Sequence, residues 1–499
     1  MADQHTITHE PITSVNLMER AAIGCFDWLK ENLVKDFSLI HVVCGTGNNG
    51  GDGLVIARLF HEVEAQVSVS ICRTGGSLSE DFEVNYQRLL DLGVKPLWIE
   101  SVDDIPSLDK DQLVIDALFG IGLNRPIKDL IESTVMAINE SGAMVISIDF
   151  PSGLFADKAV DENSSIIKAE HVLTFQVPKL ALILPDNGVY VNDFSIIDIA
   201  LDQDFIANLD SPYEWITKSM IQCWYRPRSK FSHKGSFGHS LLIGGSFGKI
   251  GAIQLATKAA MSAGSGLVSA HIPKCGYIPM QTALPEAMVE VDGENHLEYF
   301  NCLKSATAIG IGPGLGLHEK TKKGFVEFLK SNKKPLVIDA DALNILSEFE
   351  ELKSLIPEGS ILTPHPKEFA RLVGSWNNDF DKLEKLMAFS ASRKVVTVLK
   401  GAHTAICDGE RIFFNSTGNP GLAKGGSGDV LTGVITGLRA QGYPPLEAAC
   451  MGVYIHGDSA DRLIGKDKSQ ETLMASDLID GLSACFKELV DNHGIKFDR

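Results

Sequence analysis

A stretch near residue 420 combines several glycines with a single acid, a pattern that could support phosphoryl transfer. Residues 425–428 read Gly-Gly-Ser-Gly and are followed by Asp429 and by an apolar segment with helical spacing. Backbone N–H groups at a helix N-terminus carry partial positive charge and bind anions. Asp429 would lie beside a bound phosphate, where it could take a proton from a substrate hydroxyl. The alternative is that Asp429 only caps the helix; the flanking glycines favour the functional interpretation.

A second glycine-rich stretch lies near the start of the chain. Residues 39–44 predict a buried strand and residues 45–53, Gly-Thr-Gly-Asn-Asn-Gly-Gly-Asp-Gly, a loop before a helix from Leu54 to about Val63. The loop contains G-x-G-x-x-G, which is typical of a pyrophosphate site but weak on its own. That fingerprint does not require the three polar side chains among the glycines, Asn48, Asn49 and Asp52. They indicate a small-molecule or cation site.

Two more apolar segments end on an acid and open into a glycine turn. Residues 111–122 contain Asp116, and residues 144–153 contain Asp149. Parallel sheets bind ligands at the carboxyl ends of their strands. One such aspartate is more often a turn or cap residue, but three strands that deliver polar groups to one rim favour a site.

The second half of the chain has its own strands and glycine loops. Strands are expected over residues 239–243, 266–272, 306–311, 334–339, 360–363 and 395–399, and a hairpin over 404–414. Glycine loops at 244–251 and 312–316 follow two of these strands, and helices are expected over 252–263, from Asp341 and from Glu368. His365 lies between two prolines, where a surface turn and a ligand contact are equally consistent with the sequence. The P-loop motif G-x-x-x-x-G-K-[ST] does not occur.

These motifs need a scaffold, and alternating strands and helices predict an α/β protein with doubly wound sheets. In the first half, helices are expected over residues 14–33 and 79–92, strands over 66–72 and 170–175, and a short strand pair near 189–199. The two halves do not share motifs, so we expect two different domains. The pattern loosens between Asp202 and Arg228, and we place the boundary near residue 213.

Composition restricts the partners of the protein. The 499 residues suffice for two to four domains, and the net charge of −19 argues against nucleic acid. Residues 1–11 are polar and no apolar stretch is long enough to span a bilayer, so we expect a cytoplasmic protein without membrane contact. We also expect a homo-oligomer. Residues 226–238 are locally basic, which fits a solvated linker somewhat better than an anion site. The cysteines are scattered and are expected to be reduced core residues: Cys25, Cys44, Cys72, Cys223, Cys275, Cys302, Cys407, Cys450 and Cys485.

Together the motifs resemble a fused pair of nicotinamide nucleotide repair domains. Residues 47–53, 116–123 and 149–153 are similar to motifs of the NAD(P)H-hydrate epimerase domain. Motifs of the ADP-dependent NAD(P)H-hydrate dehydratase domain, which has a ribokinase-like fold, are similar to residues 234–238, 312–316, 364–366, 400–402, 417–421 and 425–429. Their order matches the fused enzyme. The resemblance implies a Rossmann-like epimerase domain over residues 1–213 and a ribokinase-like dehydratase domain over 214–499.

The resemblance also implies the reaction. Members of this family repair NADH and NADPH whose nicotinamide ring has been hydrated at C6, the compounds NADHX and NADPHX. The first domain would act as an isomerase that interconverts the R and S hydrates. The second would act as a lyase that dehydrates the S form with ADP, releasing AMP and phosphate.

In the epimerase domain, the resemblance implies that the hydrate contacts Asn48, Asn49, Gly50, Gly51, Asp52, Gly120, Ile121, Gly122, Leu123, Asn124, Arg125, Pro126 and Asp149. It implies a potassium ion held by Asn49, Asp116 and Ser152. Epimerisation at C6 requires the C–O bond to break and reform through an iminium, which nearby carboxylates can stabilise. Asp149 is therefore our candidate for proton transfer.

In the dehydratase domain, the resemblance implies that the adenine nucleotide contacts Lys400, Gly401, Ala402, His403, Thr404 and Gly428, and the hydrate contacts Ala252, Gly316, His365 and Asp429. Asp429 would take the proton of the C6 hydroxyl as ADP phosphorylates it. A Mg²⁺ ion would neutralise the phosphates and need not have a dedicated protein cage. Lys367 and Lys424 depart from the family pattern and add positive charge near the phosphates.

Two alternatives remain at this point. A ribokinase-like kinase of a vitamin precursor, with a regulatory first domain, would release a stable phosphoester instead of inorganic phosphate. Alternatively, the first domain could be a catalytically silent scaffold. Its retention of Asn49, Asp116, Asp149 and Ser152 argues against that loss of function.

Overall fold

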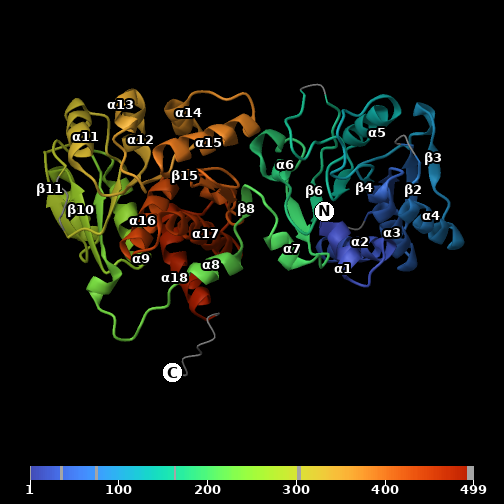
Figure 1. Cartoon of the computed structure of the whole chain (residues 1–499), viewed down its shortest axis with the longest axis horizontal. Helices are drawn as coiled ribbons and strands as arrows, with labels where there is room; N and C mark the ends of the chain where they lie inside the picture. Colours follow the sequence, from blue (N-terminus) through green and yellow to red (C-terminus); the bar gives the residue numbers. More distant parts are fainter. Residues whose placement is uncertain (1, 34–36, 74–76, 162–163, 301–304, 492–499) are drawn as a thin grey trace. The chain divides into compact units, whose positions relative to one another are not determined.

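The computed structural model describes residues 2–33, 37–73, 77–161, 164–300 and 305–491, so Cys302 lies outside the described residues. The chain forms two compact units, Met1–Asp210 with Asn378–Phe380 and Ser211–Asn377 with Asp381–Arg499 (Figure 1). Within the described part of the chain, every helix is too short or too polar to cross a bilayer.

The N-terminal unit is built on a parallel sheet, seven-stranded in its described residues. Its order is β3 (Leu97–Ile99), β2 (Val67–Cys72), β1 (Leu39–Cys44), β4 (Gln112–Ala117), β5 (Met144–Ile148), β6 (His171–Phe175) and β7 (Phe194–Ile197). The chain runs outward from β1 to β3 and then returns to place β4 against β1, in register from Leu39↔Gln112 to Cys44↔Ala117. The strand order therefore reverses between β1 and β4, which is where open α/β sheets bind ligands.

Helices cover both faces of this sheet, which confirms the doubly wound prediction. One core lies under α2 (Ser14–Asn32), α3 (Asn48–Glu62) and α4 (Glu80–Asp91). A second core lies under α5 (Asp129–Glu140) and α6 (Leu180–Ile183) on the other face. The apolar alternation along β1 reflects this arrangement, because Val42 belongs to the first core and Val43 to the second.

Three details of the N-terminal unit differ from expectation. The predicted loop over 45–53 is wrong in its second half, because α3 already begins at Asn48 and includes the glycines. Glycine disfavours helices in isolation, but here its lack of a side chain permits close packing against the sheet. The expected strand pair near 189–199 is a single strand, β7, with one isolated bridge at Val191. Helices α1 (Ala2–His9) and α7 (Gln203–Ala207) were not predicted.

The C-terminal unit contains a larger sheet, ten-stranded in the described residues. Its order is β11 (Met288–Val291), β10 (Leu267–Ile272), β9 (His239–Ile243), β12 (Ala308–Ile311), β13 (Leu336–Ile338), β14 (Ile361–Leu362), β15 (Val396–Leu399), β16 (Ala405–Cys407), β17 (Ile412–Phe414) and β8 (Tyr213–Trp215). The strands from β11 to β15 are parallel, and β16 forms antiparallel pairs with β15 and β17. The sequence did not reveal β8 or β11.

One face of this sheet is covered by α9 (Ile250–Ser262), α16 (Ser427–Ala440), α17 (Pro445–Ile464) and α18 (Ala475–Asp491) (Figure 1). In Figure 1 the other side carries α11 (Glu319–Ser331), α12 (Ala340–Glu348), α14 (Pro366–Val373) and α15 (Asp379–Arg393). Helices α9 and α16 approach closely because Gly433 faces α9: a Cβ atom at Gly433 would lie 2.1 Å from the Ala256 carbonyl oxygen. This contact fixes the position of α16, and with it the glycine-rich turn at its N-terminus.

The eight described cysteines are free thiols. Six are buried, as expected for core residues, but Cys223 is exposed and Cys275 is half-buried, so the core prediction is wrong for these two. The basic stretch after residue 226 contacts its own unit: Arg226 pairs with Glu447, and Arg228 donates to the Gly264 carbonyl oxygen. These contacts differ from a freely solvated linker.

Candidate functional sites

The first predicted site lies where α3 begins after β1. Asn48, Asn49 and Asp52 are in the first turns of α3, with Gly47 as the N-cap. A Cβ atom at Gly50 would lie 1.9 Å from the Gly45 carbonyl oxygen, so only glycine allows the helix to start this close to the strand. Gly51 similarly packs on Met18. The close packing brings the side chain of Asn49 to the carboxyl end of the sheet.

Asp116 and Ser152 form a buried polar cluster at the same end of the sheet. The Asp116 carboxylate accepts hydrogen bonds from the hydroxyls of Ser147 (2.7 Å) and Ser152 (2.6 Å) and from the amides of Leu118 (3.2 Å) and Ser152 (3.0 Å). Asp116 has no exposed surface. Burial raises the pKa of this carboxyl, and the bonds from Ser152, Ser147 and Leu118 oppose that rise.

Asp149 follows β5 in a left-handed conformation, with φ of 63°. Such a conformation is unfavourable for a residue with a side chain and is concentrated at functional sites. Its Oδ1 accepts a hydrogen bond from Lys179 Nζ at 2.9 Å, and that ammonium also donates to Thr174 Oγ1 (2.9 Å) and Phe175 O (2.8 Å). Lys179 therefore holds one oxygen of Asp149.

The other oxygen of Asp149 faces the loop after β4. A Cβ atom at Gly120 would lie 3.0 Å from Asp149 Oδ2 and 3.6 Å from Asn49 Cγ. Gly120 therefore lies between these two side chains, and the structure brings Asn49, Gly120 and Asp149 together. It does not bring in the rest of the predicted loop: residues 121–126 are mostly exposed, and Asn124 contacts Lys158.

Asn49 provides the observation that tests a cation at this site. Both polar atoms of its side chain are buried without a hydrogen-bond partner. Buried polar atoms in this state call for a ligand, water or ion. The amide oxygen of Asn49, the Asp116 carboxylate and the Ser152 hydroxyl are all oxygen donors, the kind that hard cations bind. These residues fit a potassium ion.

Asp52 adds a second carboxyl to this region. Burial raises the pKa of Asp52 well above its usual range, and the carboxylates of Asp149, Asp81 and Asp3 raise it further. Asp149 is paired with Lys179, whereas Asp52 has acidic groups around it. The two carboxyls thus differ in their surroundings, an arrangement that separates proton donor from acceptor in many enzymes.

The second predicted site lies at the N-terminus of α16. Gly426 is the N-cap, with φ of 95°, and no side chain caps this helix end. Asp429 lies in the first turn and is not the capping residue, so the structural alternative for Asp429 is wrong. The uncapped amides are available to an anion. Behind them, the buried His456 lies 3.3 Å from the Ser427 hydroxyl and 3.1 Å from its carbonyl oxygen.

Asp339 and Lys400 complete the surroundings of Asp429. Lys400 Nζ donates to Asp339 Oδ1 at 2.9 Å and lies 3.4 Å from the position of a Cβ atom at Gly428. Burial, together with the negative charge of Asp339, raises the pKa of Asp429 to about 7, although the positive charge of Lys400 opposes this rise. Burial would lower the pKa of Lys400, but Asp339 and Glu368 reverse this, and the net pKa is raised. The site thus places the Lys400 ammonium beside the Asp429 carboxyl, whose pKa lies near neutral pH, as suits a general base.

The expected hydrate contact Ala252 lies in the first turn of α9, and Gly316 lies in the loop after β12. Hydrogen bonds join this loop to the loop before α9 and to α12. Ser246 donates its hydroxyl to the Gly314 carbonyl oxygen at 2.8 Å, and Asp341 accepts from the Gly316 amide at 2.8 Å. Asp341 also pairs with Lys249 at 3.2 Å. The negative charge of Asp341 also raises the pKa of Asp429, but its effect is smaller than those of burial, Asp339 and Lys400.

His365 proves to be the N-cap of α14, which begins at Pro366 instead of the expected Glu368. Its Nδ1 accepts from the amides of Lys367 (3.1 Å) and Glu368 (3.3 Å), while Glu368 accepts from the His365 amide at 2.9 Å. This capping box fixes the ring. Burial lowers the pKa of His365, as does the positive charge of Lys400.

The expected nucleotide contacts, residues 400–404, form a turn after β15. The Thr404 hydroxyl donates to the Gly401 carbonyl oxygen at 3.1 Å and accepts from the Gly401 amide at 3.3 Å. His403 Nδ1 lies 3.2 Å from the Asn415 carbonyl oxygen. The Lys400 amide donates to Pro364 O at 2.9 Å, which joins this turn to the His365 loop. Unlike the rest of the turn, the Lys400 side chain reaches Asp339.

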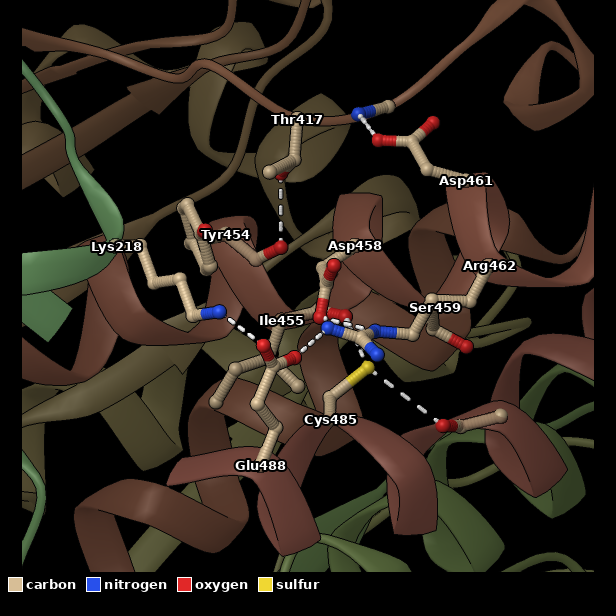
Figure 2. A network of polar contacts seen from close by, with 12 residues as sticks. Lys218, Thr417, Tyr454, Ile455, Asp458, Ser459, Asp461, Arg462, Cys485 and Glu488 are labelled. Carbon is tan, nitrogen blue, oxygen red and sulfur yellow. Dashed lines mark hydrogen bonds and ion pairs between the residues drawn. The ribbon is translucent and has the colours of Figure 1, made fainter. Parts of the chain in front are cut away.

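The loop at 417–421, which leads toward α16, is attached to α17 (Figure 2). Asp461 accepts from the Gly418 amide (2.8 Å) and from Asn419 Nδ2 (2.7 Å), and Thr417 donates its hydroxyl to Tyr454 O (2.8 Å). Figure 2 also shows the ion pairs that hold this part of α17: Arg462 pairs with Asp458 and Glu488, and Glu488 also pairs with Lys218. The side chain of Lys424 contacts the Glu471 carbonyl oxygen instead of facing the helix terminus.

Sequence reasoning missed Lys179 and Asp339, each of which pairs with an expected site residue. Lys179 follows a short apolar strand as an ordinary surface lysine would, and nothing local distinguishes it. Asp339 could have been predicted as a site residue, because it follows an apolar strand in the same way as Asp149 does. The same rule about strand ends could have identified it.

Comparison with known proteins identifies a family for each unit. Residues 14–181 match the family described as YjeF-related protein N-terminus, and residues 240–483 match NAD(P)H-hydrate dehydratase. A bifunctional NAD(P)H-hydrate repair enzyme of Moorella thermoacetica is 34% identical, over 96% of this chain and 93% of its own length. The Escherichia coli enzyme of that name is 33% identical, over 94% and 89%.

A solved structure supports the fold of the C-terminal unit. A ribokinase-like superfamily protein from Enterococcus faecalis is 29% identical, with a TM-score of 0.51, and the match covers 56% of this chain and 98% of that protein. The C-terminal unit is thus ribokinase-like. With relatives matched over nearly their full length, the chain belongs to the family of bifunctional NAD(P)H-hydrate repair enzymes.

Proposed function

We propose that this protein repairs NADHX and NADPHX. Residues 1–213 interconvert the R and S forms, and residues 214–499 dehydrate the S form with ADP and release AMP and phosphate. The observation that carries the dehydratase assignment is the position of Asp429, whose pKa is raised to about 7, in the uncapped first turn of α16. The alternative kinase activity has no separate observation in its favour.

In the dehydratase site, Asp429 takes the proton of the C6 hydroxyl as that oxygen attacks the β-phosphorus of ADP. The P–O bond to AMP breaks, and the N-terminal amides of α16 and the Lys400 ammonium stabilise the charge on the transferring group. Phosphate then leaves C6 as the ring nitrogen donates its electron pair. Loss of a proton from C5 restores the dihydronicotinamide.

In the epimerase site, the C6–O bond breaks and reforms on the opposite face of the ring. Asp149, held through one oxygen by Lys179, presents its other oxygen toward Gly120 and stabilises the iminium. Asp52, with a raised pKa, is suited to give a proton to the departing hydroxyl. The two carboxyls thus have different roles, Asp149 in stabilising the iminium and Asp52 in donating a proton.

Both sites would use metal ions. Asn49, Asp116 and Ser152 would hold potassium, which supplies positive charge that orders the substrate loop. Magnesium would accompany ADP and neutralise its phosphates.

A single assay tests both activities. A mixture of R and S hydrates is supplied with ADP and Mg²⁺, and recovery of NADH is followed by absorbance while AMP and phosphate are quantified. Complete conversion is expected. Conversion of the S form alone would refute the epimerase assignment, and a stable phosphoester without NADH would indicate the kinase.

A further inference from the structure

Asp339 occupies the N-cap position of α12 but does not cap that helix. An N-cap aspartate normally accepts a hydrogen bond from a backbone amide of the first turn, which stabilises the helix. Here the carboxylate turns away and accepts from Lys400 Nζ at 2.9 Å and from Thr432 Oγ1 at 2.7 Å. Asp339 therefore does not stabilise its own helix, and its side chain instead bonds to residues distant in the chain.

The backbone around Asp339 is fitted to this position. The next residue, Ala340, has a positive φ of 49°, which is unfavourable for a residue with a side chain. A Cβ atom at Gly312 would lie 1.8 Å from the Asp339 carbonyl oxygen, so only glycine can lie opposite. The backbone is thus strained at Ala340 and requires glycine at position 312, and between them the Asp339 residue is only 1% exposed.

The carboxylate joins three elements that meet at the phosphoryl-transfer centre. Asp339 follows β13, Lys400 follows β15, and Thr432 lies in α16, where its hydroxyl also lies 3.1 Å from the Gly428 carbonyl oxygen. The Lys400 ammonium therefore has a fixed place against the first turn of α16. The Lys400 side chain is flexible, because it has several rotatable bonds. Among the described residues, Asp339 is the carboxylate hydrogen-bonded to it, so without Asp339 nothing of this kind would hold the ammonium in place.

We propose that Asp339 is a positioning residue that holds the Lys400 ammonium against the N-terminal turn of α16 beside Asp429. This rests on the proposed dehydratase function. Asp339 acts through Lys400, which contacts the nucleotide, and through its own negative charge, which acts on the base.

The charges around Asp429 give the sign of the effect. After burial, the groups that act on its pKa are Asp339 and Asp341, which raise it, and Lys400, which lowers it. Lys400 in turn faces Glu368 on α14 and His456 on α17. Replacing Asp339 by asparagine removes a negative charge that raises the pKa of Asp429. The pKa of Asp429 therefore falls, and the acidic limb of the rate profile moves to lower pH.

The test is Asp339→Asn in the full-length chain. We expect the acidic limb of kcat/KM for the S hydrate to move down by about one pH unit, and the Kd for ADP, measured by calorimetry, to rise about tenfold. The epimerase rate of the same preparation comes from the other unit, so it measures the amount of active chain and should not change. Folding of the C-terminal unit is checked by its calorimetric transition. Asp292→Asn is the matched control, because within the described part of the chain the Asp292 carboxylate accepts hydrogen bonds from the backbone amides of Glu298 and Tyr299 in the same unit and contacts none of the proposed site residues.

A double-mutant cycle with Lys400→Met separates positioning from general destabilisation. If Asp339 acts through Lys400, the two losses of ADP affinity will be strongly non-additive. Additive losses, or an active variant with an unchanged acidic limb and unchanged ADP affinity, would overturn the proposal. If the wild-type chain lacked dehydratase activity, the proposed function would fail, and the calorimetric cycle would still decide the role of Asp339.

Discussion

Replacing Asp429 by asparagine should abolish the dehydratase reaction while stabilising the nucleotide-free C-terminal unit at about pH 8. The reason is that the carboxylate, which is the working form of the base, is the form that the folded protein disfavours. Burial and Asp339 raise the pKa of Asp429 from 3.8 to about 7. Asparagine has nearly the same shape and carries no charge at any pH.

The magnitude follows from linkage between protonation and folding. The folded-state pKa lies above the unfolded value, so the penalty is absent below about pH 4, grows as the pH rises, and is complete above about pH 7. Each tenfold change in the dissociation constant is worth about 1.4 kcal/mol, which gives an upper limit of about 4 kcal/mol. Because part of the side chain remains accessible to water, we expect about 1–2 kcal/mol.

The assay is differential scanning calorimetry of the full-length chain without nucleotide. The C-terminal transition is identified by its rise on addition of ADP and Mg²⁺. In the Asp429→Asn variant it should lie about 2–4 °C above wild type near pH 8, and the gap should fall to less than half near pH 5. ADP binding should persist while recovery of NADH is lost.

The matched control is Asp477→Asn, for which the opposite sign is expected. The amide of Met474 donates to Asp477 at 2.9 Å and lowers the pKa of that carboxyl. Its ionised form is therefore favoured by folding, and its replacement should lower the transition near pH 8. Turnover unchanged in Asp429→Asn, or a transition at or below that of wild type near pH 8, would contradict the reasoning.

Three further predictions concern the epimerase, with the dehydratase rate of the same chain as the control. Gly120→Ala places a Cβ atom 3.0 Å from Asp149 Oδ2 and should slow R-to-S conversion about tenfold; an unchanged rate would mean that this approach is irrelevant. Lys179→Met leaves a buried carboxylate unpaired and should cost about a hundredfold, with partial recovery in Lys179→Arg. Exchanging potassium for choline should lower the rate about tenfold in wild type but not in Asn49→Ala; equal sensitivity would exclude Asn49 as a ligand.

Local pattern determined much of the scaffold and the acids at the ends of its strands. The strands β1 and β9 begin and end at the residues expected from their mainly apolar sequences, because a strand buried on both faces has few polar positions. Asp149 and Asp429 were identified because glycine turns after strands and before helices are recognisable from a few neighbouring residues.

Local pattern failed where packing overrode propensity. The first turns of α3 contain Gly50 and Gly51, which predict a loop, yet they are helical. Glycine is required at position 50 because any side chain there would collide with the Gly45 carbonyl oxygen. Strand β8 is only three residues long and is a strand through its pairing with β17, nearly two hundred residues later in the chain.

The partners of the catalytic acids were decided by tertiary structure alone. Asp339 meets Lys400 and Thr432 across 61 and 93 residues, and Asp149 meets Lys179 across 30. These pairs follow from the order of strands in each sheet, which brings distant strand ends to one rim. The sequence determined which side chains could act as acid, base or anion site. The fold determined which charge stands beside each, and a neighbouring charge decides whether a carboxyl works as a base near neutral pH.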